Sequence, residues 1–238
     1  MVAESGVEII ETLPLKKNKS TVITGFAGPG FVGSAAIMHI VRSKGLKQRA
    51  YVRSQLIPPM MLLIDGQPVH AFRIYSGEND DVLLVTSEAL LMHENAWPVS
   101  LKLADWLIGK GAEAFVSVEG IPFGVPSRER TILGFSTDRD LNQLGVQIAR
   151  EGAVSGMNAC MLEECMKRRV SWTTLFIPTN VMATIDFGGA AAVVDVLNRM
   201  FKLGVDVSPL RDRDEMMRKA TEAQRAARDK GFLGKLRK

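Results

Sequence analysis

Short apolar segments with the pattern of strands alternate along this chain with longer segments that have the period of a helix. Residues 21–26, 81–88 and 112–120 are strand-like, and the first has the continuous apolar character of a strand buried on both faces. Helical patterns begin near Phe31 and cover residues 96–110. Strands joined by helices of this length pair in parallel, because the helix carries the chain back to the same end of the sheet. The sequence therefore predicts an α/β fold, with three α/β/α layers and a mainly parallel sheet.

Further elements are expected on both sides of these segments. Short strands are predicted at residues 7–10, 49–54, 131–135 and 173–178. Helices are predicted at residues 138–149 with Asp138 as the N-cap, after Gly156, and at residues 188–203. A stiff loop is expected at Pro122, Gly124 and Pro126.

Asp65, which ends the apolar-rich run of residues 60–65, is followed by Gly66, and a second apolar-rich run covers residues 69–75. An Asp-Gly pair in this position is the strongest short-range hairpin signal in the sequence, because tight hairpin turns need residues that tolerate positive φ. We therefore expect an antiparallel hairpin attached to the otherwise parallel sheet.

The positive charge of the chain is concentrated at its end. Of 30 Lys and Arg and 26 Asp and Glu, residues 211–238 hold 10 and 5, so residues 1–210 carry a net charge of −1. We therefore predict a single α/β/α domain over residues 1–210 and a basic helical C-terminal arm over residues 211–238, separated by Pro209. Nucleic acid is not an expected partner, because the arm interleaves its charge with a single aromatic residue, Phe232.

Cysteine usage and hydropathy exclude two broad classes of protein. Cys160 and Cys165 are the only cysteines, which excludes a disulfide scaffold and fits a reducing compartment. No apolar run reaches the roughly 18 residues that a membrane-spanning helix needs. The first ten residues lack the pattern of a secretory signal. The sequence predicts a cytoplasmic protein with no membrane partner.

A glycine pattern follows the strand at residues 21–26. Gly28, Gly30 and Gly33 form a G-x-G-x-x-G pattern before a helix, which in dinucleotide-binding proteins allows a pyrophosphate to approach the helix N-terminus. The acidic ribose partner expected about 20 residues later is missing, since residues 51–55 are Tyr-Val-Arg-Ser-Gln. The other interpretation is a strand–helix turn that needs glycine for positive φ and close packing.

Two carboxylates follow predicted parallel strands. Glu88 and Glu119 each stand at the carboxyl end of a strand, where ligands bind in open parallel sheets. Both side chains could face one crevice with Gly28, Gly30 and Gly33, and paired carboxylates can perform acid–base chemistry or hold a metal. Alternatively, each carboxylate bonds to neighbouring loop amides.

No complete catalytic or metal-binding pattern is present. His39, His70 and His93 have none of the spacings of a zinc site, and neither a nucleophile elbow nor a P-loop signature occurs. We therefore predict no catalytic residue, no metal and no cofactor.

Several ordered segments carry a resemblance to a known family. They are G-F-A-G-P-G-F-V-G at residues 25–33, G-I-P-F-G-V-P at 120–126, V-S-G-M-N at 154–158, I-D-F-G-G-A-A at 185–191 and V-D-V at 205–207, followed by Leu210. In this order the chain resembles the archaeal branch of the proteasome assembly chaperone family, the family typified by proteasome assembly chaperone two. The resemblance covers about residues 7–210.

The resemblance implies a fold similar to nucleoside phosphorylases, assembly into homo-oligomers and a chaperone or adaptor role. Gly28, Gly30 and Gly33 match the first glycine turn of the family, Gly156 the later helix entry and Asp186 the acidic position before the Ala-rich helix. Fold alone does not establish chemistry.

The C-terminus departs from the chaperones that dock directly on the proteasome. Those proteins end in hydrophobic-Tyr-any, whereas this sequence ends Gly-Lys-Leu-Arg-Lys at residues 234–238. Insertion of the tail into a proteasome α-ring is therefore not expected, and contact through another surface stays open.

Together these features predict a non-enzymatic chaperone or scaffold. It would form a homo-oligomer, a trimer or larger, and contact proteasome subunits or a client protein. The alternative is a nucleotide- or nucleoside-binding enzyme that uses the Gly28–Gly33 turn.

Overall fold

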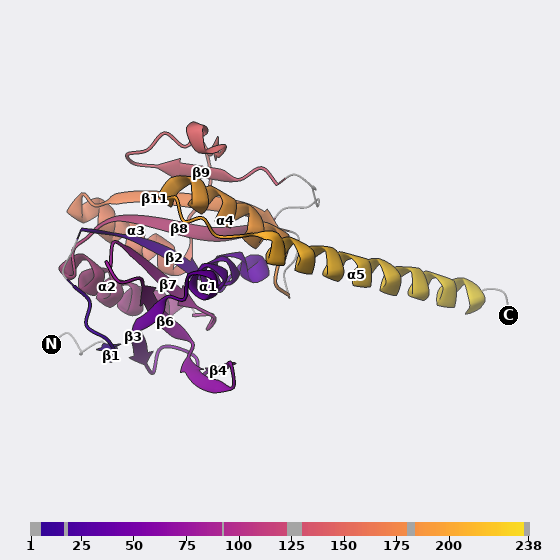
Figure 1. Cartoon of the computed structure of the whole chain (residues 1–238), viewed down its shortest axis with the longest axis horizontal. Coiled ribbons are helices and arrows are strands. Elements are labelled where there is room, and N and C mark those ends of the chain that lie inside the picture. Colours follow the sequence, from indigo (N-terminus) through magenta and orange to yellow (C-terminus); the bar gives the residue numbers. More distant parts are fainter. Residues whose placement is uncertain (1–5, 17–18, 92, 123–129, 180–183, 236–238) are drawn as a thin grey trace.

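The computed structural model describes residues 6–16, 19–91, 93–122, 130–179 and 184–235, with side chains of the last helix described as far as residue 223. These residues form an α/β fold with a mixed nine-stranded sheet, a separate two-stranded hairpin and five α-helices (Figure 1). The α/β class predicted from the alternation of strands and helices is confirmed. Most of the predicted loop at residues 122–126 lies outside the described residues.

The main sheet runs in the order β1-β3-β6-β7-β2-β8-β11-β9-β10. Its strands are β1 (Val7–Glu11), β2 (Ser20–Phe26), β3 (Lys47–Ser54), β6 (Phe72–Ser76), β7 (Val82–Ser87), β8 (Ala112–Pro122), β9 (Leu133–Ser136), β10 (Gln147–Ile148) and β11 (Ser171–Thr179). The central strands β7, β2, β8 and β11 pair in parallel, as predicted. The pairs β1–β3, β3–β6, β6–β7 and β11–β9 are antiparallel. The five residues between β6 and β7 are too few for a helical crossover, so these two strands can only pair antiparallel.

Helices cover both faces of this sheet. They are α1 (Val32–Lys44), α2 (His93–Gly109), α3 (Gly156–Arg168), α4 (Phe187–Phe201) and α5 (Ser208–Lys235), with short 3₁₀ turns η1 (Pro29–Phe31) and η2 (Asn142–Leu144). One core cluster joins α1 and α4 to the sheet, and a second joins α2 and α3 to its other face. On β2, Ile23 belongs to the first cluster and Val22 to the second, and both are fully buried. A strand covered on both sides explains the continuous apolar run in the sequence.

The predicted helix at residues 138–149 is wrong. The segment forms η2 and the short strand β10, which pairs with β9. Ser136 Oγ accepts a hydrogen bond from the Arg139 N–H at 3.2 Å, and Asp140 Oδ1 accepts one from the Asn142 N–H at 3.0 Å. Such local side-chain bonds to the backbone favour turns over a continuous helix.

The hairpin is present, although it does not join the main sheet. Asp65 and Gly66 have φ of 51° and 75°, the signs that a type I′ turn requires. The strands β4 (Met61–Ile64) and β5 (Gln67–His70) pair only with each other in the described structure, and β6 enters the main sheet directly after them. Pro68 in β5 lacks an amide donor, which suits a strand outside a central ladder.

The last helix leaves the body of the molecule. Helix α5 starts at Ser208, so Pro209 lies in its first turn instead of separating it from the body. Leu210 is buried in the core, whereas residues 211–223 are exposed apart from the half-buried Asp214. Figure 1 shows α5 projecting as a single rod far beyond the sheet and its covering helices. Among the helices of the described residues, none combines the length and the apolar character needed to cross a bilayer.

Candidate functional site

The predicted glycine turn connects β2 to α1. Gly30 has a φ of 64° and Phe31 a φ of 47°, so the chain makes a left-handed turn before the helix. The carbonyl oxygen of Gly30 accepts a hydrogen bond from the Asp186 N–H at 2.8 Å, which joins the turn to the start of α4. This turn therefore holds the starts of two helices together at one edge of the sheet.

Close packing explains the glycine at the start of α1. A Cβ atom at Gly33 would lie 2.8 Å from the Val118 carbonyl oxygen and 2.9 Å from the Gly25 Cα. Added Cβ atoms at Gly25 and Gly120 would collide with the backbone of Gly33 and Pro29. The turn therefore packs directly on β2 and β8, which supports the packing interpretation of these glycines. A Cβ at Gly28, by contrast, would meet no described atom within 4 Å.

Glu88 stands at the end of β7 and is held by a buried arginine. The Arg73 Nη2 donates a hydrogen bond to Glu88 Oε1 at 2.6 Å, and the Arg73 side chain has no exposed surface. Arg73 also donates to the Tyr75 hydroxyl at 2.7 Å and to the His70 carbonyl oxygen. Within the described part of the chain, Glu88 Oε2 is buried and has no hydrogen-bond partner. One carboxylate oxygen is thus paired with Arg73, and the other is enclosed by protein atoms.

A cavity of about 540 Å³ opens beside Glu88. It lies between α1, the hairpin strand β4 and the starts of α4 and α5. Its walls are mainly apolar, and they are formed by Phe31, Ala35, Met38, Leu62, Leu63, Ile64, Ile185, Phe187, Pro209 and Leu210. Its polar and charged lining is Ser34, His39, Arg42, Glu88, Thr184 and Arg213. Glu88 is therefore the predicted site residue that lines this cavity, whereas Gly28, Gly30, Gly33 and Glu119 do not.

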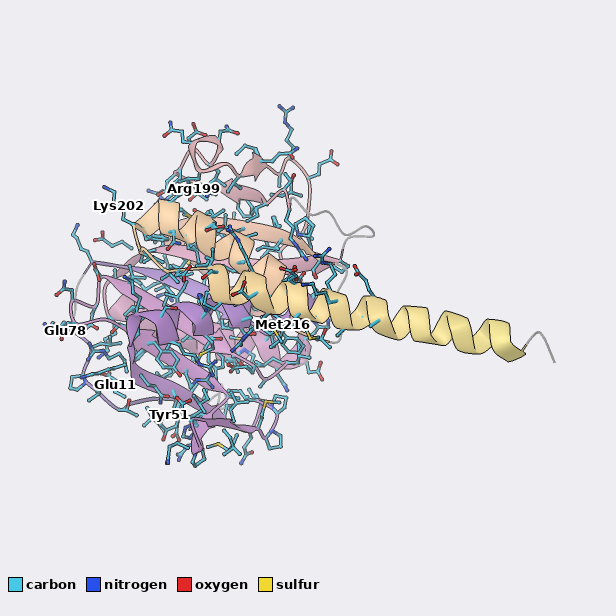
Figure 2. The ribbon with its side chains drawn as sticks, turned by 45° about the vertical axis from the view of Figure 1, so that its right-hand side comes forward. Glu11, Tyr51, Glu78, Arg199, Lys202 and Met216 are labelled. Atoms are coloured by element: carbon cyan, nitrogen blue, oxygen red, sulfur yellow. The ribbon has the colours of Figure 1, made fainter. Side chains whose placement is uncertain are left out.

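Exposed apolar side chains lie on the walls of the cavity and on the first turns of α5. Leu63 of β4 is 79% exposed, and Ile185, just before α4, is also exposed. On α5, Met216 is 70% exposed and Met217 is exposed beside it. Figure 2 shows Met216 where α5 leaves the body of the molecule. Apolar groups gathered in this way commonly mark an interaction site.

Glu119 lies on the other face of the sheet, towards α3. Its carboxylate accepts hydrogen bonds from the Asn158 side chain and from the Ser155 backbone N–H, and Ser117 Oγ lies 3.5 Å from Glu119 Oε1. Burial raises the pKa of Glu119 to about 7, because desolvation of the carboxylate outweighs these three hydrogen bonds. The structure therefore does not bring Glu88 and Glu119 into one crevice.

Asp186, which matches the acidic family position, has a structural role. It is the N-cap of α4, since Oδ1 accepts a hydrogen bond from the Gly189 N–H at 2.8 Å. Its Oδ2 accepts a hydrogen bond from Thr179 Oγ1 at 2.6 Å and forms an ion pair with Arg130. Both carboxylate oxygens of Asp186 therefore help to fix the start of α4.

The histidines occupy separate places. His39 Nε2 lies 2.7 Å from the Asp206 carbonyl oxygen, and the His70 ring stacks on Tyr51 at a centroid distance of 3.6 Å. Over the described ranges, no three His, Cys, Asp or Glu side chains are grouped closely enough to hold a metal ion.

Comparison with known sequences places the chain in a family. The sequence profile of the PAC2 family matches residues 22–225, most of its length. The chain belongs to the PAC2 family. An uncharacterized protein of Methanocaldococcus jannaschii, MJ0106, is 28% identical over 216 residues, which cover 86% of this chain and 84% of that protein.

Two solved structures are similar to this chain over nearly its full length. Pyrococcus furiosus PbaA, described as an archaeal homologue of proteasome-assembly chaperone, is 27% identical, with a TM-score of 0.82 over 94% of this chain and 95% of its own. Pyrococcus furiosus PbaB, described as an archaeal proteasome activator, superposes with a TM-score of 0.80 over 93% of this chain and 99% of its own. At 18% identity, the likeness to PbaB shows a shared fold. The resemblance to proteasome assembly chaperones is confirmed at the level of the family.

Sequence reasoning missed most of the residues that build the cavity, and it missed Arg73, the partner of Glu88. Arg73 gave a usable signal, since an arginine inside the apolar run of residues 69–75 must find a partner when the strand is buried. Arg42 and Arg213 gave none, because each is one basic residue among many on a helix surface.

Proposed function

We propose that this PAC2-family chain is a non-enzymatic, homo-oligomeric chaperone or scaffold in the cytoplasm that acts by binding other proteins. Proteasome subunits are the first partners to consider, because PbaA is described as a homologue of a proteasome-assembly chaperone and is similar to this chain over nearly its full length. The proposed oligomer contains three or more copies.

The projecting helix α5 is the observation that supports this proposal best. Of its 28 residues, those from 211 to 223 are exposed on every side except at Asp214. A helix gains most of its stability from packing an apolar face, and one that is solvated all round is marginal alone. Met216 and Met217 are exposed on this helix, where a soluble monomer gains nothing from them. A protein partner, either another copy or a different chain, would bury them.

We place the proposed contact on side chains near the body of the molecule, along the first turns of α5 and around the hairpin. The division into residues 1–210 and an arm of residues 211–238 is part of this proposal.

Two measurements on the full chain test the proposal. Light scattering at micromolar concentration is expected to give at least three times the chain mass of 26.1 kDa. Coexpression with the proteasome α-subunits of the source organism is expected to give a complex that survives gel filtration. A particle of one chain mass, or no complex with the subunits, would overturn the corresponding half of the proposal.

Variants of exposed methionines provide a matched control. Met216→Glu combined with Met217→Glu adds charge to α5 without touching the core, and we expect it to abolish the complex or reduce the oligomer. Met166→Glu changes an equally exposed methionine on α3 and is expected to have no effect. Equal behaviour of the two variants would contradict a contact through α5.

A further inference from the structure

The cavity beside Glu88 has the size and chemistry of a binding site. Its volume of about 540 Å³ falls within the roughly 300–1,000 Å³ that is typical of ligand-binding clefts. The walls from α1, β4 and α4 are mainly apolar, with Met38 and Leu62 half-buried on opposite elements. An apolar side chain could therefore enter the cavity and lose its contact with water.

Two exposed arginines from different helices line the cavity. Arg42 lies on α1 and Arg213 on α5, and the Arg213 guanidinium lies 5.6 Å from the centre of the Phe187 ring. Among the described residues, neither arginine has a carboxylate within 4 Å. Glu88, the acidic residue in the lining, is already paired with the buried Arg73. The mouth of the cavity is therefore positively charged and complementary to a carboxylate.

Glu88 also lines the cavity, and its Oε1 accepts a hydrogen bond from Arg73 Nη2 at 2.6 Å. Because this buried ion pair neutralises the carboxylate, Glu88 does not cancel the positive charge that Arg42 and Arg213 bring to the cavity.

The apolar surface extends beyond the cavity itself. Leu63 lines the cavity yet is 79% exposed, and Met61 beside it on the hairpin is 56% exposed. Ile185 is exposed on the opposite wall. A small molecule inside the cavity would leave most of this surface in water, whereas a polypeptide crossing the mouth would cover it.

We propose that this cavity binds an acidic–apolar peptide segment of a partner protein. An apolar side chain of the segment fills the space between α1, β4 and α4, and a neighbouring Asp or Glu side chain pairs with Arg42 and Arg213. This inference rests on the proposed function in requiring a protein partner, and it adds the chemistry by which the partner is recognised.

Selection from a displayed library of random peptides tests the inference with the full chain. Peptides of about 12 residues are long enough to cross such a site. We expect the enriched sequences to place Asp or Glu next to Leu, Ile, Met, Phe or Trp. A synthetic copy of an enriched peptide is expected to lose about tenfold or more in affinity when its acidic residue is replaced by the matching amide. Enrichment of basic peptides, or no enrichment, would overturn the inference.

Variants of the chain locate the binding site. Arg42→Glu combined with Arg213→Glu is expected to weaken the same peptide by about tenfold or more. Arg150→Glu combined with Arg169→Glu makes the same change of net charge at exposed arginines outside the cavity and away from α5, and is expected to bind normally. Ala35→Phe is expected to block the cavity, and Leu63→Ser, at an exposed position, weakens binding without a risk to the core. Unchanged binding in the double Arg42 and Arg213 variant would overturn the inference.

The outcomes separate this inference from the proposed function. If acidic–apolar peptides bind at the cavity but no complex with proteasome subunits forms, the proposed partner is wrong and the inference stands. If the complex forms and Arg42→Glu with Arg213→Glu leaves peptide binding intact, the inference alone fails. If Ala35→Phe converts the oligomer into a monomer, a second copy of this chain occupies the cavity, and the inference is overturned.

Discussion

Two carboxylates at the same edge of the sheet are stabilised in opposite ways on its two faces. Glu88 follows β7 and faces α1, where it pairs at 2.6 Å with the fully buried Arg73. Glu119 lies in β8 and faces α3. Its carboxylate accepts hydrogen bonds from Asn158 and Ser155, and among the described residues no cation pairs with it. Glu88 is thus stabilised by an ion pair, whereas Glu119 is stabilised by hydrogen bonds from groups at the start of α3.

The difference shows that position in the topology does not fix the chemistry of a strand-end carboxylate. On the α1 face, Glu88 lines a mainly apolar cavity, and Arg73 neutralises its carboxylate from inside the protein. On the α3 face, burial raises the pKa of Glu119 to about 7, so this carboxylate changes its charge near neutral pH. Four experiments probe the comparison.

The ion pair on the α1 face should give the largest effect. Glu88→Ala leaves the Arg73 guanidinium buried without its counter-ion, and loss of one partner of a buried pair costs about 3–5 kcal/mol. We expect the free energy of unfolding, measured by urea denaturation, to fall by about that amount. Glu8→Ala breaks the exposed Arg53–Glu8 pair and should cost no more than about 1 kcal/mol. Similar losses in the two variants would show that Arg73 does not depend on Glu88.

The carboxylate on the α3 face should make stability depend on pH. Because its pKa is about 7 in the folded state and near 4.5 as a free side chain, the folded protein holds this proton more tightly. The contribution of the Glu119 carboxyl group to the free energy of unfolding is therefore greatest below pH 4.5, and it is lost as the pH rises through 7. We expect Glu119→Gln to be more stable than the native chain at pH 8, by up to about 3 kcal/mol, and to differ little near pH 4.5. Urea denaturation across this pH range measures the gap, and a gap that does not change with pH would contradict it.

The two helices that cover these carboxylates also begin differently. At Gly33 of α1, a Cβ would lie 2.8 Å from the Val118 carbonyl oxygen, whereas at Gly156 of α3 it would meet no described atom within 4 Å. We expect Gly33→Ala to lower the free energy of unfolding by about 1–3 kcal/mol through overpacking. Gly156→Ala should cost about 1 kcal/mol, from the positive φ alone. Thermal unfolding compares the two, and a larger loss at Gly156 would contradict close packing of α1.

Nucleotides should produce the smallest effect. The glycine turn packs against its own sheet, and Glu88 and Glu119 lie on different faces, so we expect no shared site for a phosphate and a ribose. About 1 mM ATP or adenosine should therefore change the Tm by less than about 1 °C. A ligand at 100 times its Kd would stabilise the folded state by about 2.7 kcal/mol and raise the Tm by roughly 5–11 °C in a chain of this size, and such a shift would support the nucleotide-binding alternative.

Elements whose formation depends only on residues adjacent in the sequence could be predicted. The Asp65–Gly66 turn formed because positive φ at two adjacent positions is a local requirement, and the apolar period placed α1, α2 and α4 near their true ranges. The segment at residues 138–149 shows the limit of that reasoning. Its spacing suits a helix, but side chains of Ser136 and Asp140 bond to the backbone and β9 supplies a pairing edge that no local pattern reveals.

The sequence by itself determined the α/β class, the hairpin turn and the positions of two strand-end carboxylates. Only the tertiary structure decided which face each carboxylate occupies, because side chains alternate along a strand and a shift of one residue reverses the face. It also brought Arg42 and Arg213, from two helices far apart in the chain, to one cavity with Glu88, whose carboxylate pairs with Arg73. Such a site depends on long-range packing, which neighbouring residues in a sequence do not encode.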